Sequence, residues 1–199
     1  MTVCFEPGDV ERHASASGTQ IVLRRVQPRD AELLLRAFEK LSPESRYRRF
    51  FGHKNALSPD EVRSLTACDG TDHFAIGAVV EGADGSEEGV GVARFIHHRH
   101  DPRTAEAAVT VIDAFQKRGI GSLLAGRLLS AAAERGVDRL EFAVLAENQP
   151  MLVLLRKLAL AAGACAESRS DGIAVTVILP TAPFGRARHA RTPGPTFRS

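Results

Sequence analysis

The sequence predicts a single domain of the α/β or α+β class. Its 199 residues are 44% hydrophobic and 25% charged, a balance typical of one globular domain with a full-sized core. Stretches with a strand pattern alternate with stretches of helical periodicity, which indicates helices packed on a sheet. No internal repeat is visible in the sequence, so a repeat architecture is not expected.

The chain divides into a central domain and two terminal segments. Residues 1–19 are rich in Gly, Ser, Ala and charge and have little periodicity, so we expect a flexible arm there. The domain is expected over residues 20–180. Residues 181–199 carry four arginines and no acid, which predicts a basic, disordered tail. Subtracting those four charges from the net charge of +2 leaves the rest of the chain near −2.

The first part of the domain predicts one strand and then three helices. Residues 20–26 have the pattern of a strand, and apolar residues between positions 33 and 41 fall on one helical face. Ser42 and Ser58 each stand before a proline, as N-cap residues do. Glu61 completes a capping box with Ser58, so a short helix is expected to about residue 66.

The second part predicts six strands and two longer helices. Polar turns separate the strands, and Gly136 is placed to end the first of the two helices. An Asp-Gly pair at residues 171–172 predicts a hairpin between the last two strands. The expected strands cover residues 73–80, 90–95, 104–113, 140–145, 165–169 and 173–179, and the expected helices cover residues 120–135 and about 148–161.

A glycine-containing loop between a strand and a helix is the most informative motif. It reads Gln116, Lys117, Arg118, Gly119, Ile120, Gly121. A helix that begins after such a loop offers free backbone N–H groups and the positive end of its dipole, which together bind phosphate. The two glycines allow close approach of the backbone to an anion, and the two basic side chains add positive charge. The loop therefore predicts a site for a phosphorylated cofactor.

Three phosphate-binding patterns compete for this loop. A dinucleotide fingerprint requires a third glycine, and that position holds Leu124. A Walker loop requires Gly-Lys followed by Ser or Thr, which is absent here. The pattern Q/R-x-x-G-x-G/A, which grips the pyrophosphate of an acyl-CoA, fits without exception. Its context of strand, loop, helix and second strand, with Asn148 just beyond, favours this third interpretation.

Over residues 20–180 the chain resembles the GNAT superfamily of N-acetyltransferases. The loop and its context carry this resemblance. Within the superfamily it is most similar to bacterial Pat-type protein lysine acetyltransferases, as a stand-alone catalytic domain. The closer likeness rests on three blocks, which are residues 41–51 (LSPESRYRRFF), 105–109 (AEAAV) and 144–151 (VLAENQPM).

The resemblance implies a fold and a cofactor. The expected sheet is mixed but mostly antiparallel, has six to seven strands, is splayed between its fourth and fifth strands, and is flanked by about four helices. Acetyl-CoA would enter the wedge between those two strands. The implied cofactor contacts are the backbone of Val109 and Val111 for pantetheine, the loop residues Gln116, Lys117, Arg118, Gly119, Ile120, Gly121 and Ser122 for pyrophosphate, and Asn148 near the thioester.

Glu106 is the candidate catalytic base. Acyl transfer from a thioester to an amine needs a neutral amine, and neutralising a free lysine at pH 7 costs about 4–5 kcal/mol. A positioned base helps to meet that cost. Glu106 lies in the expected fourth strand, where the resemblance places the catalytic glutamate. Ala105, Ala107 and Ala108 are expected to leave room for substrate and to desolvate the carboxylate partly. The alternative is a strand glutamate that simply faces water.

The general acid departs from the family pattern. The tyrosine that protonates the leaving thiolate in many relatives is Leu155 here, and Tyr47 is the only tyrosine of the chain. The thiolate of CoA would then leave unassisted or take its proton from water, since a thiol pKa near ~8.5 makes it a fair leaving group. Glu141 and Glu147 are weaker candidates for a base than Glu106.

The function that these features favour is transfer of an acetyl group to a protein lysine, with direct attack on the thioester. By the resemblance, an acyl-CoA synthetase is the implied protein partner. Transfer to a small amine, such as a polyamine, an amino acid or an antibiotic, stays open because fold does not determine substrate. A module that binds acyl-CoA without catalysis also stays open. The sequence does not choose between a monomer and a homodimer.

Other compositional features narrow the class of protein. The small net charge gives no reason to expect a nucleic-acid partner, and residues 151–166 are too short and too charged to span a membrane. The cysteines form no CxxC pair, which together with the lack of a signal peptide favours reduced thiols in the cytoplasm. We expect no metal site, because a solvated turn explains the histidines His97, His98 and His100 better. A solvated helix face or a docking patch would explain the arginines Arg46, Arg48 and Arg49.

Overall fold

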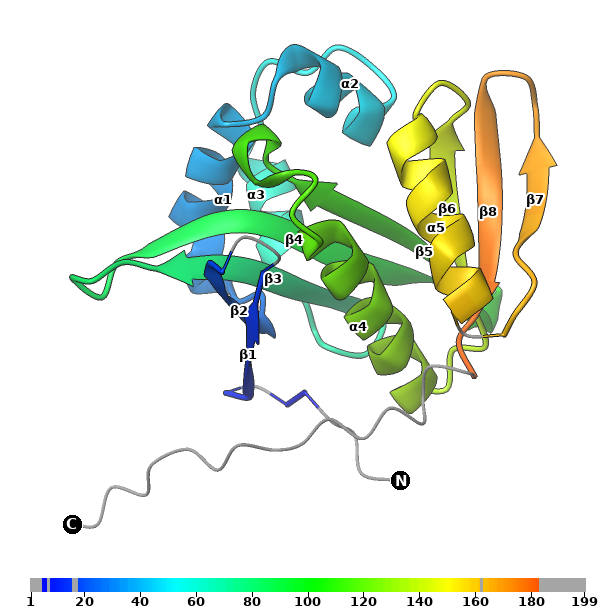
Figure 1. The fold of residues 1–199 in the computed structure, drawn as a ribbon, viewed down its shortest axis with the longest axis horizontal. Helices are drawn as coiled ribbons and strands as arrows, with labels where there is room; N and C mark the ends of the chain where they lie inside the picture. Colours follow the sequence, from blue (N-terminus) through cyan, green and yellow to red (C-terminus); the bar gives the residue numbers. More distant parts are fainter. Residues whose placement is uncertain (1–4, 7, 16–17, 162, 183–199) are drawn as a thin grey trace.

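A computed structural model describes residues 5–6, 8–15, 18–161 and 163–182. In this part of the chain eight strands form one sheet in the order β1-β2-β3-β4-β5-β6-β8-β7 (Figure 1). All neighbouring strands are antiparallel except β5 and β6. The strands are β1 Val10–Ala14, β2 Gln20–Arg25, β3 His73–Glu81, β4 Glu87–His98, β5 Asp101–Val111, β6 Arg139–Leu145, β7 Glu167–Ser170 and β8 Ala174–Pro180.

Helices cover both faces of this sheet. Figure 1 shows α1 and α3 behind the strands, α4 and α5 in front of them, and α2 across one end. Short 3-10 turns at Pro28–Asp30 and Asp113–Phe115 precede α1 and the glycine loop. The described α-helices are α1 Ala31–Glu39, α2 Pro43–Phe50, α3 Pro59–Thr66, α4 Ile120–Glu134 and α5 Gln149–Ala161.

The helix ends match the patterns read from the sequence. The hydroxyl of Ser58 accepts a hydrogen bond from the backbone N–H of Glu61 at 3.2 Å, and the Glu61 carboxylate accepts one from the Ser58 N–H at 2.8 Å. The expected capping box of α3 is therefore confirmed. Ser42 caps α2 by accepting from the N–H of Ser45, and Gly136 follows α4 with a φ of 78°, as expected for a helix end.

The sheet opens between β5 and β6. These two strands pair in parallel over only three residue pairs, Thr104–Arg139, Ala105–Leu140 and Glu106–Glu141, and pair no further toward Val111. They are the fourth and fifth strands expected from the sequence, so the predicted splay is confirmed. Beyond Glu106 the facing backbone groups of β5 and β6 leave room for another molecule in the plane of the sheet.

The N-terminal arm is where the structure differs from the expectation. Residues 1–19 were expected to be flexible throughout, but Val10–Ala14 form β1, which pairs with β2 from Val10–Arg24 to Ala14–Gln20. This strand raises the count above the expected six or seven. The cause is a long-range contact that no local pattern reveals: Glu11 accepts a hydrogen bond at 2.8 Å from the guanidinium of Arg127 on α4. The expected basic tail, except for Thr181 and Ala182, lies outside the described residues.

Alternation along β5 assigns its side chains to opposite faces. Ala105 and Ala107 are buried on the face covered by α4, while Glu106 and Thr110 belong to the face of α1 and α2.

No helix of the described residues is long and apolar enough to cross a bilayer.

Candidate active site

A cavity of about 510 Å³ occupies the opening between β5 and β6. Its walls come from β5, β6, the glycine loop, the start of α4, the start of α5 and the end of α2. Most residues that the sequence assigned to a cofactor or to catalysis meet here. Those lining the cavity are Glu106, Val109, Val111, Gln116, Lys117, Gly119, Gly121, Ser122 and Asn148.

The loop before α4 has the backbone shape that an anion site needs. Lys117 and Gly119 have positive φ angles of 60° and 84°, so the chain turns sharply just before α4 begins at Ile120. Gly119 has no side chain to cap the helix. The first backbone N–H groups of α4 therefore remain available to phosphate oxygens at the positive end of the helix dipole.

The side chain of Gln116 connects this loop to β5 and α2 by hydrogen bonds. Its side-chain amide donates to the carbonyl of Val111 at 3.1 Å and to the hydroxyl of Ser45 on α2 at 3.3 Å. Asp113 joins the same contact by accepting hydrogen bonds from the hydroxyls of Ser42 and Ser45 at 2.8 and 2.9 Å. The loop is thus tied to the start of α2 by side chains far away in the sequence.

The network around Asp113 also controls its ionisation. Partial burial favours the neutral acid, but the hydrogen bonds from Ser42 and Ser45 outweigh burial and hold the pKa of Asp113 below its ordinary value. Asp113 therefore stays a carboxylate at neutral pH. A charged acceptor strengthens each hydrogen bond that joins α2 to the loop.

Three residues of the loop motif make structural contacts that the motif does not predict. Ile120 is buried in the core with 1% exposure, so only its backbone can meet a cofactor. The guanidinium of Arg118 lies over the ring of Phe115 at 4.9 Å and does not line the cavity. A Cβ added to Gly121 would lie 3.0 Å from Leu154 on α5, so this glycine lets two helices approach closely.

Asn148 is the N-cap of α5. Its side-chain oxygen accepts a hydrogen bond from the backbone N–H of Met151 at 3.3 Å. The cap orients the side chain at the edge of the cavity, which Asn148 also lines. Its amide nitrogen makes no hydrogen bond with the described residues, so it is available as a donor to a bound molecule.

Glu106 is exposed and lies on the face of the sheet that α2 overlooks. Ile96 on β4 and Glu141 on β6 are its register partners. The side chains of Ala105 and Ala107 point to the opposite face of the sheet, so they do not cover the Glu106 carboxylate. Glu106 can therefore reach a substrate that approaches from outside the sheet.

Helix α2 and the residue after it supply a wall that residue chemistry did not assign to the site. Ser45, Arg48, Arg49, Phe50 and Phe51 line the cavity, opposite β5. The sequence signal for them was the block of residues 41–51, which indicated a family likeness but no role. The arginines of this helix do not form one solvated face, since each makes different contacts.

The position of the missing tyrosine cannot supply a proton. Leu155 is fully buried in α5, and Tyr47 lies beside His53 with the ring centres 5.6 Å apart. Tyr47 does not line the cavity. Within the described residues, no group of three or more His, Cys, Asp and Glu side chains is placed to hold a metal ion.

A sheet that opens at a parallel strand pair, with a phosphate loop on one side and a carboxylate on the other, suits an enzyme that moves an acyl group carried by a nucleotide thioester. The comparisons agree. The model of the acetyltransferase (GNAT) domain family matches residues 20–160, and the chain belongs to this family. It is an acyltransferase, and acetyltransferases of this family use acetyl-CoA.

Named relatives support the likeness to Pat. The acetyltransferase Pat of Mycolicibacterium smegmatis is 36% identical over 144 residues, which are 71% of this chain and 41% of Pat. The solved GNAT domain of S. lividans PAT matches with a TM-score of 0.75 and 25% identity, over 86% of this chain and 96% of that domain. A cAMP-binding acyltransferase from Mycobacterium smegmatis matches with a TM-score of 0.61 and 28% identity, over 92% and 50% of the two chains.

The chain spans half or less of the two mycobacterial relatives, 41% of one and 50% of the other. The likeness therefore concerns the acetyltransferase domain. What the remainder of those proteins does is not carried over.

Proposed function

We propose that this protein transfers the acetyl group of acetyl-CoA to the side-chain amine of a protein lysine, with Glu106 as the general base. The observation that carries the proposal is the cavity of about 510 Å³, which joins the anion-binding loop to Glu106 through the opening of the sheet. A molecule with a phosphate at one end and a reactive group at the other fits this layout.

The cavity walls suit acetyl-CoA along their length. The start of α4 offers N–H donors to the pyrophosphate, and the unpaired backbone of Val109 and Val111 offers hydrogen-bonding groups to the pantetheine amides. The amide of Asn148 stands nearer the reacting end. When bound, acetyl-CoA supplies an acetyl thioester, and the protein supplies orientation and a base.

The reaction then follows from the position of Glu106. The acceptor amine, in its neutral form, attacks the thioester carbonyl carbon, so a C–N bond forms while the C–S bond breaks. Glu106 takes the proton that the nitrogen loses, and the CoA thiolate leaves with the electron pair of the C–S bond. Water carries a proton to the thiolate, because Leu155 offers no acid at the position where relatives carry a tyrosine.

An open acceptor side favours a protein over a small amine. Glu106 is exposed, and the apolar side chains of Ile96 and Phe51 near it are 48% and 42% exposed. A polyamine site would instead be enclosed and acidic, whereas Arg49 also lines this cavity. The 36% identity with Pat supports the same class of acceptor. An acyl-CoA synthetase is the acceptor that we would test first.

Replacing Glu106 with glutamine tests the assigned base. We expect Glu106→Gln to lower kcat for acetylation of a lysine-containing protein by about 100-fold or more, because general base catalysis contributes that much. Acetyl-CoA affinity, measured by isothermal titration calorimetry, should change less than about threefold, since Glu106 lies apart from the anion-binding loop.

The matched control is Glu167→Gln, an exposed glutamate on the edge strand β7. Its turnover should equal that of the unchanged protein. Equal turnover of Glu106→Gln and the control would refute the role of Glu106. Tight acetyl-CoA binding without acetylation of any protein or amine in the panel would instead favour a binding module.

A further inference from the structure

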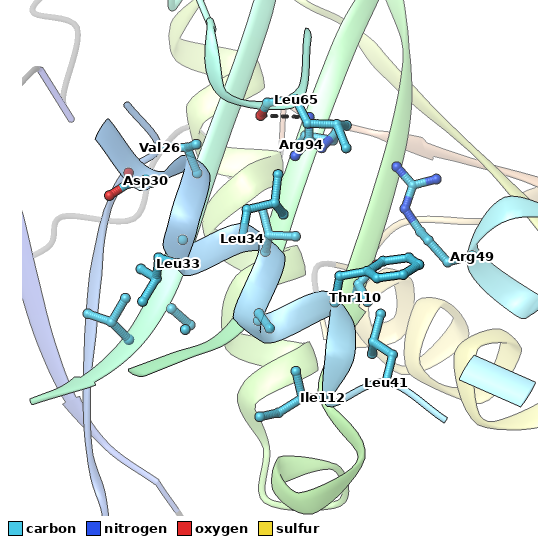
Figure 2. A pocket seen from close by; sticks show the side chains of 18 of the residues that line it. Val26, Asp30, Leu33, Leu34, Leu41, Arg49, Leu65, Arg94, Thr110 and Ile112 are labelled. Atoms are coloured by element: carbon cyan, nitrogen blue, oxygen red, sulfur yellow. Dashed lines mark hydrogen bonds between the residues drawn. The ribbon is translucent and has the colours of Figure 1, made fainter. Parts of the chain in front are cut away.

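Arg49 lies where two cavities meet. It lines the acetyl-CoA cavity together with Glu106, and it also lines a second, mostly apolar cavity of about 100 Å³ between α1 and the sheet. Figure 2 shows its guanidinium projecting from α2 toward the strands, at the end of the second cavity where Arg94 lies. Arg49 is therefore a cation on the acceptor side of the sheet.

This guanidinium has no acidic partner in contact. Within the described part of the chain Arg49 makes no ion pair and no hydrogen bond, and its guanidinium lies over the ring of Phe50 at 5.2 Å. Burial lowers the pKa of Arg49 below its ordinary value, and the nearby charge of Glu106 partly opposes this effect. Glu106 is thus close enough to attract Arg49, although the two do not form an ion pair.

A second buried cation, Arg94, lines the smaller cavity together with Arg49. Arg94 on β4 is 4% exposed and donates to the carbonyl of Leu65 at 3.1 Å, while its other close polar neighbour is His73 at 3.2 Å. Burial lowers the pKa of Arg94 to about 10, and the charge of Arg49 adds to this effect. Neither arginine is paired with a carboxylate of the described residues, so two positive charges lie on the side of the sheet to which Glu106 belongs.

Positive charge at this place affects the protonation of the acceptor amine, which is the nucleophile of the proposed reaction. A free lysine with a pKa near ~10.4 is neutral in about one molecule in 2,500 at pH 7. A positive charge close to an amine disfavours its ammonium form, and it does so more strongly where burial reduces screening. Glu106 can accept the released proton from the same space.

We propose that Arg49 acts on the acceptor amine by charge repulsion and so favours the neutral amine that attacks the thioester. The inference rests on the proposed function and adds a second device to it, since Glu106 removes the proton and Arg49 makes the proton easier to remove. Because Arg49 and Glu106 line the same cavity, an amine that enters it to meet Glu106 would also come close to Arg49.

The other charges around Arg49 are already engaged. Arg48, on the same helix, is ion-paired with Glu44, and Lys54 is ion-paired with Glu61. On the sheet side, Glu141 is paired with His98 at 3.3 Å, and at the far end of the second cavity Arg24 holds Asp30. Glu106, Arg94 and the partly buried His73 and Cys68 also face this region, from β5, β4, β3 and the end of α3, and Lys117 of the glycine loop lines the same cavity as Arg49.

The test is a pH profile of variants at Arg49. The probe acceptor is Nα-acetyl-lysine amide, and kcat, which reports ionisation in the bound complex, is measured from about pH 6.5 to 10 with saturating acceptor and acetyl-CoA. We expect Arg49→Gln to be about tenfold slower than the unchanged protein at pH 7, which corresponds to a change of about one unit in amine pKa. The difference between the two profiles should narrow from about tenfold at pH 7 to about threefold near pH 10, because a growing share of the amine is neutral there without help.

Two further variants separate charge from structure. Arg49→Lys keeps the positive charge and should retain most of the rate at pH 7, whereas Arg156→Gln, at an exposed position of α5, should leave the whole profile unchanged. A defect of Arg49→Gln that is equally large at every pH, or an Arg49→Lys variant as slow as Arg49→Gln at pH 7, would overturn the inference.

A less basic acceptor distinguishes action on the amine from action on Glu106. With an analogue whose amine pKa is about two units lower, the defect of Arg49→Gln at pH 7 should shrink, because much more of that amine is neutral already. A defect that is independent of acceptor basicity would mean that Arg49 works through Glu106 or the cofactor, and would overturn the inference alone. Absence of turnover by the unchanged protein would overturn the proposed function as well.

Discussion

At the scale of single residues, the site depends on contacts between side chains that are distant in sequence. Asp113 stands between the end of β5 and the glycine loop, and its carboxylate holds the hydroxyls of Ser42 and Ser45 at the start of α2. Because α2 also carries Arg49 into the cavity, this small network sets the position of one cavity wall relative to the loop.

Replacing Asp113 tests that network. Asp113→Asn keeps the shape but loses the charge, so we expect a loss of stability on the order of 1 kcal/mol at pH 7, a figure reduced for the exposure of the group. Since the pKa of Asp113 is lowered in the folded protein, its contribution is complete above the ordinary value of 3.8 and disappears as pH falls through the lowered pKa. Urea unfolding at pH 7 and near pH 3 measures both.

The difference in unfolding free energy between the two proteins should therefore be larger at pH 7 than near pH 3. Ser168, an exposed serine on β7, offers a control when replaced with alanine, since it lies away from the site. A difference that is the same at both pH values would show that the Asp113 charge does not stabilise the fold.

The sequence alone predicted some residues of the site but not others. Glu106, Gly119 and Asn148 stand at expected distances along a known pattern, so they could be named and do line the cavity. The role of Asp113 could not be named, because its bond to Ser45 links positions 68 residues apart. The position of Arg49 was equally hidden, since a basic helix predicts solvated arginines.

At the scale of elements, the spacing between α4 and α5 determines how the cavity is walled. A Cβ added to Gly121 on α4 would lie 3.0 Å from the side chain of Leu154 on α5, so that leucine would have to shift, whereas a Cβ at Gly126, further along the same helix, would have its nearest neighbour Leu158 at an ordinary 3.8 Å. The two glycines of one helix thus differ only in how closely the next helix approaches.

Alanine at each position separates packing from helix propensity. Replacing glycine with alanine inside a helix stabilises it by up to about 1 kcal/mol. We expect Gly126→Ala to show most of that gain in thermal or urea unfolding. Gly121→Ala should show little or none, because its Cβ would lie 3.0 Å from Leu154, and it should weaken acetyl-CoA binding as α5 is displaced. Equal gains and equal affinities would contradict a tight contact at Gly121.

Local sequence patterns predicted which segments form helices and which form strands. They did not always predict the residues at which these helices and strands begin and end. The strand expected over residues 90–95 extends from Glu87 to His98, because its ends pair with β3 and β5 over a longer register than its apolar residues suggest. The helix expected over residues 120–135 is found at Ile120–Glu134, since the glycines at both ends give clear limits. Strand β1 had no such signal, as its order comes from β2 and α4.

At the scale of the whole molecule, an ion pair connects the N-terminal strand to α4, the helix that follows the glycine loop. Arg127 on α4 has a side chain only 2% exposed, and it meets Glu11 of β1 at 2.8 Å and Glu134 at 3.5 Å. Its guanidinium also lies over the ring of Phe5 at 4.6 Å. Glu11 and Phe5 therefore contact a buried charge of α4 from the N-terminal side of the domain.

Weakening this connection should cost stability without changing the site. Glu11→Gln removes one negative charge from a buried arginine, so we expect the unfolding free energy to fall by about 2–4 kcal/mol. Acetyl-CoA affinity at a temperature well below the midpoint should stay the same, since Glu11 does not line the cavity. The control is Glu81→Gln on β3, because Glu81 forms an exposed ion pair with Arg12 of β1. This replacement should lower the unfolding free energy by less than about 1 kcal/mol. A loss no larger than that of the control would argue against a structural role for Glu11.

The short parallel pairing of β5 with β6 has a consequence for solubility and folding. Most sheets have two outer edges, and proteins protect those edges because exposed strand backbones recruit other chains. This sheet has a third edge in its interior, on β5 from Ala107 to Val111, where the strand has no partner on the β6 side. On the proposed function, the pantetheine arm completes the sheet there as a missing strand would, so that binding the donor and protecting an aggregation-prone edge are one event.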